Sequence, residues 1–302
     1  MDLRALAMGL AFAFIWASAF TSARIIVADA PPLGALALRF LLSGLLGVGI
    51  ALALGQSWRL TREQWRATLI FGISQNALYL GLNFVAMQTL EASMAAIIAS
   101  TMPLLVALFG WLVLREKVRP LGTLGLVIGF AGVAIIMGSR ITGGVDLYGL
   151  MLCVGGVFAL TTATLAVRSA SSGGNVLMIV GLQMLVGAAA LAVASVVAGE
   201  SPEVRWSWPL ILAFAYTTIF PGLVATLIWF LLVRRIGAVR AATFHFLSPF
   251  FGVSIAALLL GETLGPLDVA GVGVIMAGIL AVQLSKQVRP AAQTAHPRDR
   301  SP

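Results

Sequence analysis

The side chains best suited to binding a solute are amides and hydroxyls that lie inside long apolar segments. The segment 67–87 contains Gln75, Asn76, Tyr79 and Asn83. The last three are spaced i, i+3 and i+7, which places them on one face of an α-helix. If such an apolar segment lies in a membrane, its polar groups are costly and face a cavity or a partner. The pattern fits either the polar wall of a binding site or hydrogen bonds that join helices.

A second group of candidates combines a histidine, a serine and two tryptophans. His245 and Ser248 are spaced i and i+3, and His245 can carry a proton or contact a substrate. Trp16 lies near the middle of its apolar segment, away from the interface where tryptophans usually gather, and Trp229 is a further candidate for contact with a ligand. The alternative for these side chains is packing or hydrogen bonding between helices.

Arg39 is the only basic residue placed well within an apolar segment, about two turns from one end. A guanidinium at that depth can hold a substrate carboxylate through two parallel hydrogen bonds. It can instead extend to the membrane surface or pair with Asp29. No carboxylate lies in the middle of an apolar segment, so the sequence gives no sign of an acidic proton relay.

These residues belong to a chain that is too apolar for a soluble protein. Of its 302 residues 60% are hydrophobic and only 10% charged, and the mean hydropathy is +1.02, whereas a soluble domain is about a quarter charged. The net charge of +8 does not indicate a nucleic-acid partner, because the basic residues lie in loops between apolar segments. The single Cys153 excludes an internal disulfide and fits a packing role.

Ten apolar segments reach the length of about 20 residues that a membrane helix needs. They are 5–27, 33–54, 67–87, 93–114, 120–139, 146–167, 175–198, 208–232, 240–260 and 265–285. The first segment resembles a secretory signal, but it continues beyond the candidate cleavage site, so we expect it to be retained as a span. Residues 286–302 are polar and basic and are expected to form a disordered tail.

The distribution of basic residues predicts the orientation of these spans. Fifteen of the 19 Lys and Arg residues lie on the side of the N-terminus, three lie on the opposite side, and the remaining one is Arg39. Because Lys and Arg gather in cytoplasmic loops, both termini are expected in the cytoplasm. We therefore expect a multi-pass protein of the cell (inner) membrane.

The chain contains an internal repeat with an offset of 146 residues. The matching pairs include prolines, acids and glycines in one register: Pro103 with Pro249, Glu116 with Glu262, Pro120 with Pro266, Gly125 with Gly271, and Gly132 with Gly278. We predict a first unit over residues 1–140 and a second over 141–285. Because each unit has five spans, the second enters the membrane from the opposite face. The predicted fold is an all-α integral membrane protein of ten transmembrane helices in two inverted five-helix repeats.

These motifs resemble the drug/metabolite transporter superfamily, in its ten-helix EamA-type branch. The resemblance rests on residues 16–20 (Trp-Ala-Ser-Ala-Phe), on Pro103 and Pro249, and on the blocks at 114–116 and 260–263, and it covers residues 5–285. Within the branch the chain is similar to YddG-like exporters of aromatic amino acids. The resemblance implies a central cavity, outward movement of amino acids or related metabolites, and no use of ATP.

The sequence favours a secondary transporter over other classes. A P-loop is absent, as are the His-Glu-x-x-His and Gly-x-Ser-x-Gly motifs, so we expect neither ATPase activity nor an intramembrane enzyme, and no metal or cofactor. Pro103 and Pro249 are candidates for gating bends, or for static kinks. The expected partners are a small-molecule substrate and the lipid bilayer. Uptake, proton coupling and transport of other metabolites or drugs stay open as alternatives.

Overall fold

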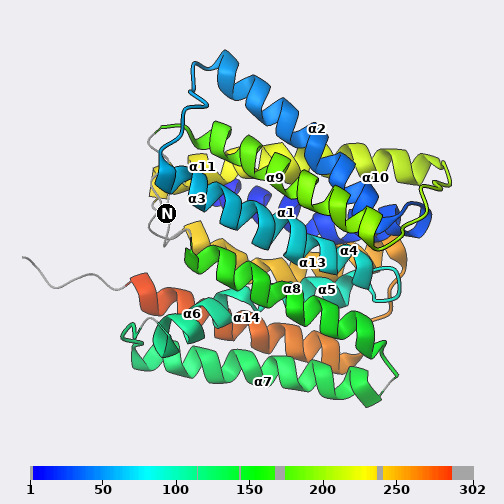
Figure 1. Cartoon of the computed structure of the whole chain (residues 1–302). Coiled ribbons are helices and arrows are strands. Elements are labelled where there is room, and N and C mark those ends of the chain that lie inside the picture. The colour runs from blue at the N-terminus through cyan, green and yellow to red at the C-terminus, as the bar shows by residue number, and fades with distance from the viewer. Residues whose placement is uncertain (1–2, 114, 143, 167–173, 237–240, 288–302) are drawn as a thin grey trace, which may run out of the picture.

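Ten long apolar helices run side by side in the computed structural model, which describes residues 3–113, 115–142, 144–166, 174–236 and 241–287 (Figure 1). This part of the chain is helical and contains no strand. All ten helices are long and apolar enough to cross a membrane, which confirms the ten predicted spans. They cover Leu3–Asp29, Pro32–Ala53, Arg62–Ala86, Ala92–Leu112, Pro120–Ile141, Leu147–Leu165, Val176–Val197, Trp208–Val233, Thr243–Leu260 and Pro266–Lys286.

Six of the ten spans are single α-helices. They are α1 (Leu3–Asp29), α2 (Pro32–Ala53), α7 (Pro120–Thr142), α8 (Leu147–Ala166), α9 (Val176–Val197) and α14 (Pro266–Gln287). The predicted bounds agree with these to within a few residues. The third span begins five residues earlier than predicted, at Arg62, because Thr61 and Gln64 form a reciprocal capping box.

The third and eighth spans each contain a π-helical segment. The third consists of α3 (Arg62–Phe71), η1 (Gly72–Tyr79) and α4 (Leu80–Ala86), and the eighth of α10 (Trp208–Ile219), η2 (Phe220–Val224) and α11 (Ala225–Ile236). The offset of 146 residues places η1 over η2, although the two spans are barely alike in sequence. Such segments interrupt the regular hydrogen-bond ladder and are frequent at functional sites.

The fourth and ninth spans are interrupted just before a proline. The fourth is divided into α5 (Ala92–Ser100) and α6 (Met102–Leu112), and in the ninth a 3-10 segment, η3 (Thr243–Leu247), precedes α13 (Ser248–Leu260). Pro103 and Pro249 lie in the first turns of α6 and α13, where a missing N–H costs little. Each proline thus begins a new helix inside the membrane.

Two helix pairs are held close by glycines. A Cβ atom on Gly278 of α14 would lie 2.4 Å from the Cα atom of Gly129 on α7. A Cβ atom on Gly181 of α9 would lie 2.7 Å from the backbone nitrogen of Val48 on α2. Small residues at such crossings allow backbones to approach closely. These pairs join the fifth span to the tenth and the second to the seventh, and α2 and α7 lie at opposite edges of the molecule (Figure 1).

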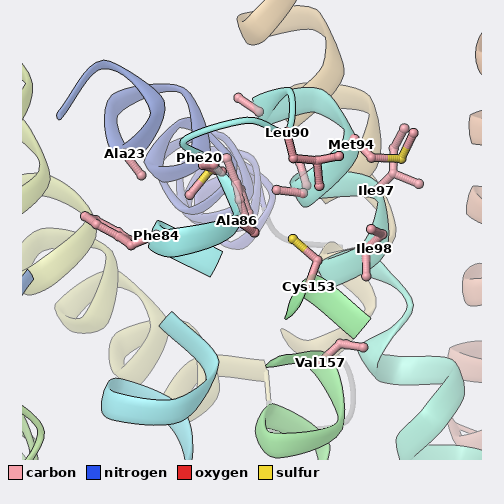
Figure 2. Packing of buried hydrophobic residues seen from close by; sticks show 14 of the residues in the cluster. Phe20, Ala23, Phe84, Ala86, Leu90, Met94, Ile97, Ile98, Cys153 and Val157 are labelled. Carbon is pink, nitrogen blue, oxygen red and sulfur yellow. The ribbon is translucent and has the colours of Figure 1, made fainter. Parts of the chain in front are cut away.

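A cluster of buried apolar side chains surrounds α5, which packs against α13, α1 and α8, and Figure 2 shows part of this cluster. Phe84, Met94 and Ile97 are each 1% exposed there, and Cys153 is buried among them. Many large apolar side chains on other helix faces remain exposed, such as Leu45 on α2 and Leu258 on α13. Lipid chains would cover these outward faces in a membrane.

Candidate functional site

A cavity of about 440 Å³ lies between the spans, within the size range of small-molecule sites. Its walls come from the first four spans and from the sixth to the ninth. The lining is mainly apolar, with a few polar groups. The lining includes Phe12, Trp16, Arg39, Phe40, Gln64, Gln75, Asn76, Leu80, Thr164, Val176, Gln183, Pro221, Thr226, Trp229 and His245.

The cavity extends from the N-terminal side of the helix bundle to beyond its middle. Gln64, Thr164 and Val176 lie at the ends of their spans on that side. The lining residues closest to the opposite side are Arg39 and Leu80, each about two turns from the end of its span. The cavity is therefore reached from the side where the chain begins.

The opposite ends of the spans are tied together by carboxylates. Glu262 accepts hydrogen bonds from the backbone N–H groups of Ala92 (2.7 Å) and Ser93 (2.9 Å), at the start of α5. Glu200 does the same for Leu33 and Gly34 at the start of α2, both at 2.9 Å. A carboxylate is favourable at a helix N-terminus because the free N–H groups and the helix dipole attract it.

Arg140 adds ion pairs at the same end of the molecule. Its Nη2 lies 2.8 Å from Asp268 Oδ2 and its Nε lies 3.1 Å from Asp268 Oδ1, while its Nη1 lies 2.9 Å from Glu91 Oε2. The arginine therefore links α7 to α14 and to the start of α5. Together with the bonds of Glu262 and Glu200, these contacts tie the spans to one another at the end opposite the opening of the cavity; we call them the far-end contacts.

Four aromatic side chains form a cluster on the cavity wall. Phe12 and Trp229 have ring centroids 4.8 Å apart, and His245 packs edge-on against Phe12 at 5.2 Å. Trp16 lies 5.9 Å from Phe12 and 6.2 Å from His245. The rings come from α1, α11 and η3, so three distant segments build the cluster. Such faces can stack on the ring of a ligand.

Four neutral amides are part of the polar lining: Gln64, Gln75, Asn76 and Gln183. The Nδ2 of Asn76 donates to the backbone oxygen of Gln183 (2.9 Å), which fixes the orientation of this amide. Gln75 and Gln64 lie on the same span, and Gln64 also takes part in the capping box at Thr61. Sequence reasoning missed Phe12, Gln64 and Gln183; the isolated polar position of Gln183 within an apolar span was a usable signal.

Arg39 lies on the cavity wall with its guanidinium largely enclosed. The residue is only 5% exposed, and its Nε has no hydrogen-bond partner among the described residues. The guanidinium carbon stands 5.0 Å from the ring centroid of Phe40. Neither alternative from the sequence is found, because Arg39 does not reach the surface and Asp29 instead pairs with Arg205 at 3.3 Å.

Three of the candidate binding residues lie outside this cavity. Tyr79 is 2% exposed, and Asn83 donates to the backbone oxygen of Tyr79 (2.8 Å) while its Oδ1 lies 3.5 Å from Cys153 Sγ on α8. Ser248 is also buried, and its hydroxyl has no partner in the described part of the chain. The structure thus brings Trp16, Gln75, Asn76, Trp229, His245 and Arg39 to one cavity and leaves these three aside.

The π-helical segment explains why Asn76 separates from Tyr79 and Asn83. The expected common face assumed 3.6 residues per turn. In η1 the hydrogen bonds run from i to i+5, so the turns are wider and the angles between successive side chains are smaller. Asn76 lines the cavity, whereas Tyr79 and Asn83 turn toward α8, where a Cβ atom on Gly156 would lie 2.7 Å from Asn83 Nδ2.

No group of three or more His, Cys, Asp or Glu side chains that could hold a metal ion occurs among the described residues. The lining of the cavity consists of groups that can bind a solute. It offers aromatic faces, amides and one guanidinium, and it opens toward one end of a bundle of membrane spans. Fold and site together define a polytopic membrane protein with an internal cavity large enough for a small solute.

The chain belongs to the EamA-like transporter family, whose model matches it twice, over residues 3–138 and 147–284. It is similar to the uncharacterized transporter YvbV of Bacillus subtilis (strain 168), with 28% identity over 95% of this chain and 94% of that protein. It is also similar to the uncharacterized inner membrane transporter YedA of Escherichia coli (strain K12), with 28% identity over 94% of this chain and 92% of the relative.

A solved crystal structure supports the fold. It aligns with a TM-score of 0.67 over 93% of this chain and 98% of its own, at 20% sequence identity. The protein is therefore a multi-pass membrane transporter of the EamA-like family, in the drug/metabolite transporter superfamily. These two relatives have no named substrate, so they do not test the predicted similarity to exporters of aromatic amino acids.

Proposed function

We propose that this transporter exports small metabolites from the cytoplasm, and that amino acids with hydrophobic or aromatic side chains are among them. The observation that carries the proposal is the cavity itself. It combines the aromatic cluster of Phe12, Trp16, Trp229 and His245 with amides and with Arg39, in about 440 Å³. An aromatic amino acid needs an apolar wall for its ring and polar groups for its backbone end, and the cavity offers both.

The direction of loading follows from the predicted orientation. If the N-terminal side faces the cytoplasm, as the distribution of Lys and Arg predicts, the cavity is open to the cytoplasm and closed toward the outside. A transporter in this state takes up its solute from inside the cell. The chain has no P-loop, so we propose secondary transport in the inner membrane.

Alternating access is proposed to arise from the two inverted units, 1–140 and 141–285. Breaking the far-end contacts and closing the cavity at the N-terminal side would exchange the conformations of the two units. Pro103 and Pro249 lie at corresponding interruptions of the fourth and ninth spans. We propose that each proline allows its span to bend during one half of the cycle.

Opposite effects of two substitutions would test this mechanism. Pro103→Ala and Pro249→Ala should shift the conformational equilibrium in opposite directions, because the two prolines lie in oppositely oriented spans. Spin-label distances across the two ends of the protein in lipid would report the shifts. Shifts in the same direction would show that the prolines act only as static kinks.

The substrate is tested by flux measurements with purified protein in liposomes. A panel of labelled amino acids, with and without a pH gradient, should show flux of aromatic and large apolar members. Trp229→Ala should reduce that flux, whereas Arg59→Gln should not, because Arg59 is exposed and does not line the cavity. Absence of flux for every amino acid would refute this substrate assignment.

The same assay also tests a second candidate function, which is uptake, proton-coupled transport, or transport of other metabolites or drugs. His245 on the cavity wall gives this alternative a specific basis, because a histidine can carry a proton. Flux that requires a pH gradient and is lost in His245→Gln would favour proton-coupled transport. Flux that persists without the gradient in both directions would favour facilitated diffusion.

A further inference from the structure

The charges around the cavity are unbalanced. Arg39 is the one charged side chain among the described residues that line it, and no Asp or Glu is part of the wall. The carboxylates of Asp268 and Glu262 are engaged in the far-end contacts. From the described residues, the solute therefore meets one fixed positive charge and no fixed negative charge.

The guanidinium itself lacks the partner that a buried cation requires. Arg39 is 5% exposed, its Nε is without a hydrogen-bond partner in the described chain, and no carboxylate there lies within 4.0 Å of it. Buried charges in proteins are ordinarily paired. A guanidinium presents a planar set of donors that matches a carboxylate through two parallel bonds. The missing partner is thus an anion of that shape.

We propose that Arg39 binds the carboxylate of the solute and that the cavity consequently selects carboxylates and rejects amines. This inference rests on the proposed transport through the same cavity. A doubly charged anion fits less well, because one guanidinium neutralises one charge and the remaining lining is neutral.

The wall offers much less to an ammonium group. Its neutral acceptors are amide oxygens, such as that of Gln75, and the hydroxyls of Thr164 and Thr226, together with the faces of the aromatic cluster. These contacts do not replace an ion pair in an apolar surrounding. An aromatic carboxylate that lacks the amino group should therefore bind at least as tightly as the amino acid. An amine that lacks the carboxylate should bind poorly.

Three compounds with the same ring test the inference: indole-3-propanoate, L-tryptophan and tryptamine. Their dissociation constants are measured by calorimetry on the full-length protein in lipid nanodiscs. The order expected is indole-3-propanoate at least as tight as tryptophan, and both roughly tenfold or more tighter than tryptamine, because charge-assisted hydrogen bonds are the stronger ones.

Substitutions of Arg39 test whether its charge and its planar shape cause the preference for carboxylates. Arg39→Gln should abolish the preference for the carboxylate, and Arg39→Lys should keep part of it, since lysine retains the charge but loses the planar pair of donors. Arg59→Gln removes the same charge from an exposed loop and should bind like the unchanged protein. Size-exclusion profiles show whether each variant is folded.

The inference is overturned if tryptamine binds as tightly as indole-3-propanoate, if none of the three compounds binds, or if Arg39→Gln keeps the original ratio. A failure of the proposed function is detected separately, because that function is measured as flux of the amino-acid panel into liposomes. Flux that persists unchanged in Arg39→Gln would refute the role of Arg39 and leave the transport itself standing.

Discussion

Replacing Arg39 by methionine is expected to stabilise the protein while it abolishes carboxylate binding. Methionine keeps an unbranched stem beside Phe40 and removes a buried donor that has no partner in the described chain. An unsatisfied buried polar group costs about 1–3 kcal/mol. The free energy of unfolding should therefore rise by roughly that amount when no solute is bound. A residue that destabilises the empty protein and is required for binding is typical of a functional site.

Arg140→Met provides the contrast, because Arg140 has partners. Its removal would leave Asp268, whose side chain is only 5% exposed, without its ion pair. Breaking a buried pair costs ~3–5 kcal/mol, and the partial exposure of Arg140 and Glu91 places the expected loss near the lower end.

Equilibrium unfolding by dodecyl sulfate in mixed micelles, followed by tryptophan fluorescence, measures both variants against the unchanged protein. The expected result is opposite signs for Arg39→Met and Arg140→Met. A loss of stability in Arg39→Met would mean that the guanidinium supports the fold through contacts of its own. The reasoning that it awaits a ligand would then be refuted.

Three further predictions concern the ends of the spans. In a cysteine-free background, a cysteine at Ser201 should react with an impermeant thiol reagent in intact cells and one at Gly55 should not; the reverse pattern would invert the topology. Hydrogen bonds from the Thr89 hydroxyl and nearby backbone N–H groups lower the pKa of Asp146 below its usual 3.8. Asp146 therefore stabilises the folded protein at pH values above 3.8, and this contribution is lost as the pH falls through the lower pKa of the folded state. Asp146→Asn should accordingly reduce the loss in free energy of unfolding at acid pH. Glu262→Gln should weaken the cap on α5 by about 1 kcal/mol and lengthen spin-label distances across the far end; unchanged distances would contradict its role there.

The membrane setting explains why so much of the fold was predictable. In lipid every backbone polar group must be bonded internally, so an apolar run of sufficient length forms a helix. The ten predicted spans all occur in the structure. The prediction missed the π-helical segments η1 and η2 within two of them, because these segments arise without a distinctive local pattern, whereas Pro103 and Pro249 marked the interruptions of the fourth and ninth spans.

The kinds of residue in the candidate site were predictable from the sequence, but the full set of residues that line the cavity was not. Trp16, Trp229, His245 and Arg39 were singled out because they are unusual inside an apolar run, and all four line the cavity. Phe12 escaped notice, because one more phenylalanine in such a run carries no signal until its neighbours are known.

The sequence by itself determined that this chain is a ten-span membrane protein with prolines at corresponding points of two similar halves. Length, hydropathy and spacing are local properties, and lipid leaves the backbone few alternatives. The tertiary structure alone decided which polar side chains share a cavity. The wider turns of η1 separate Asn76 from Tyr79 and Asn83, and Arg205 rather than Arg39 pairs with Asp29. These outcomes depend on helix register and on contacts between segments far apart in the chain, which no local pattern encodes.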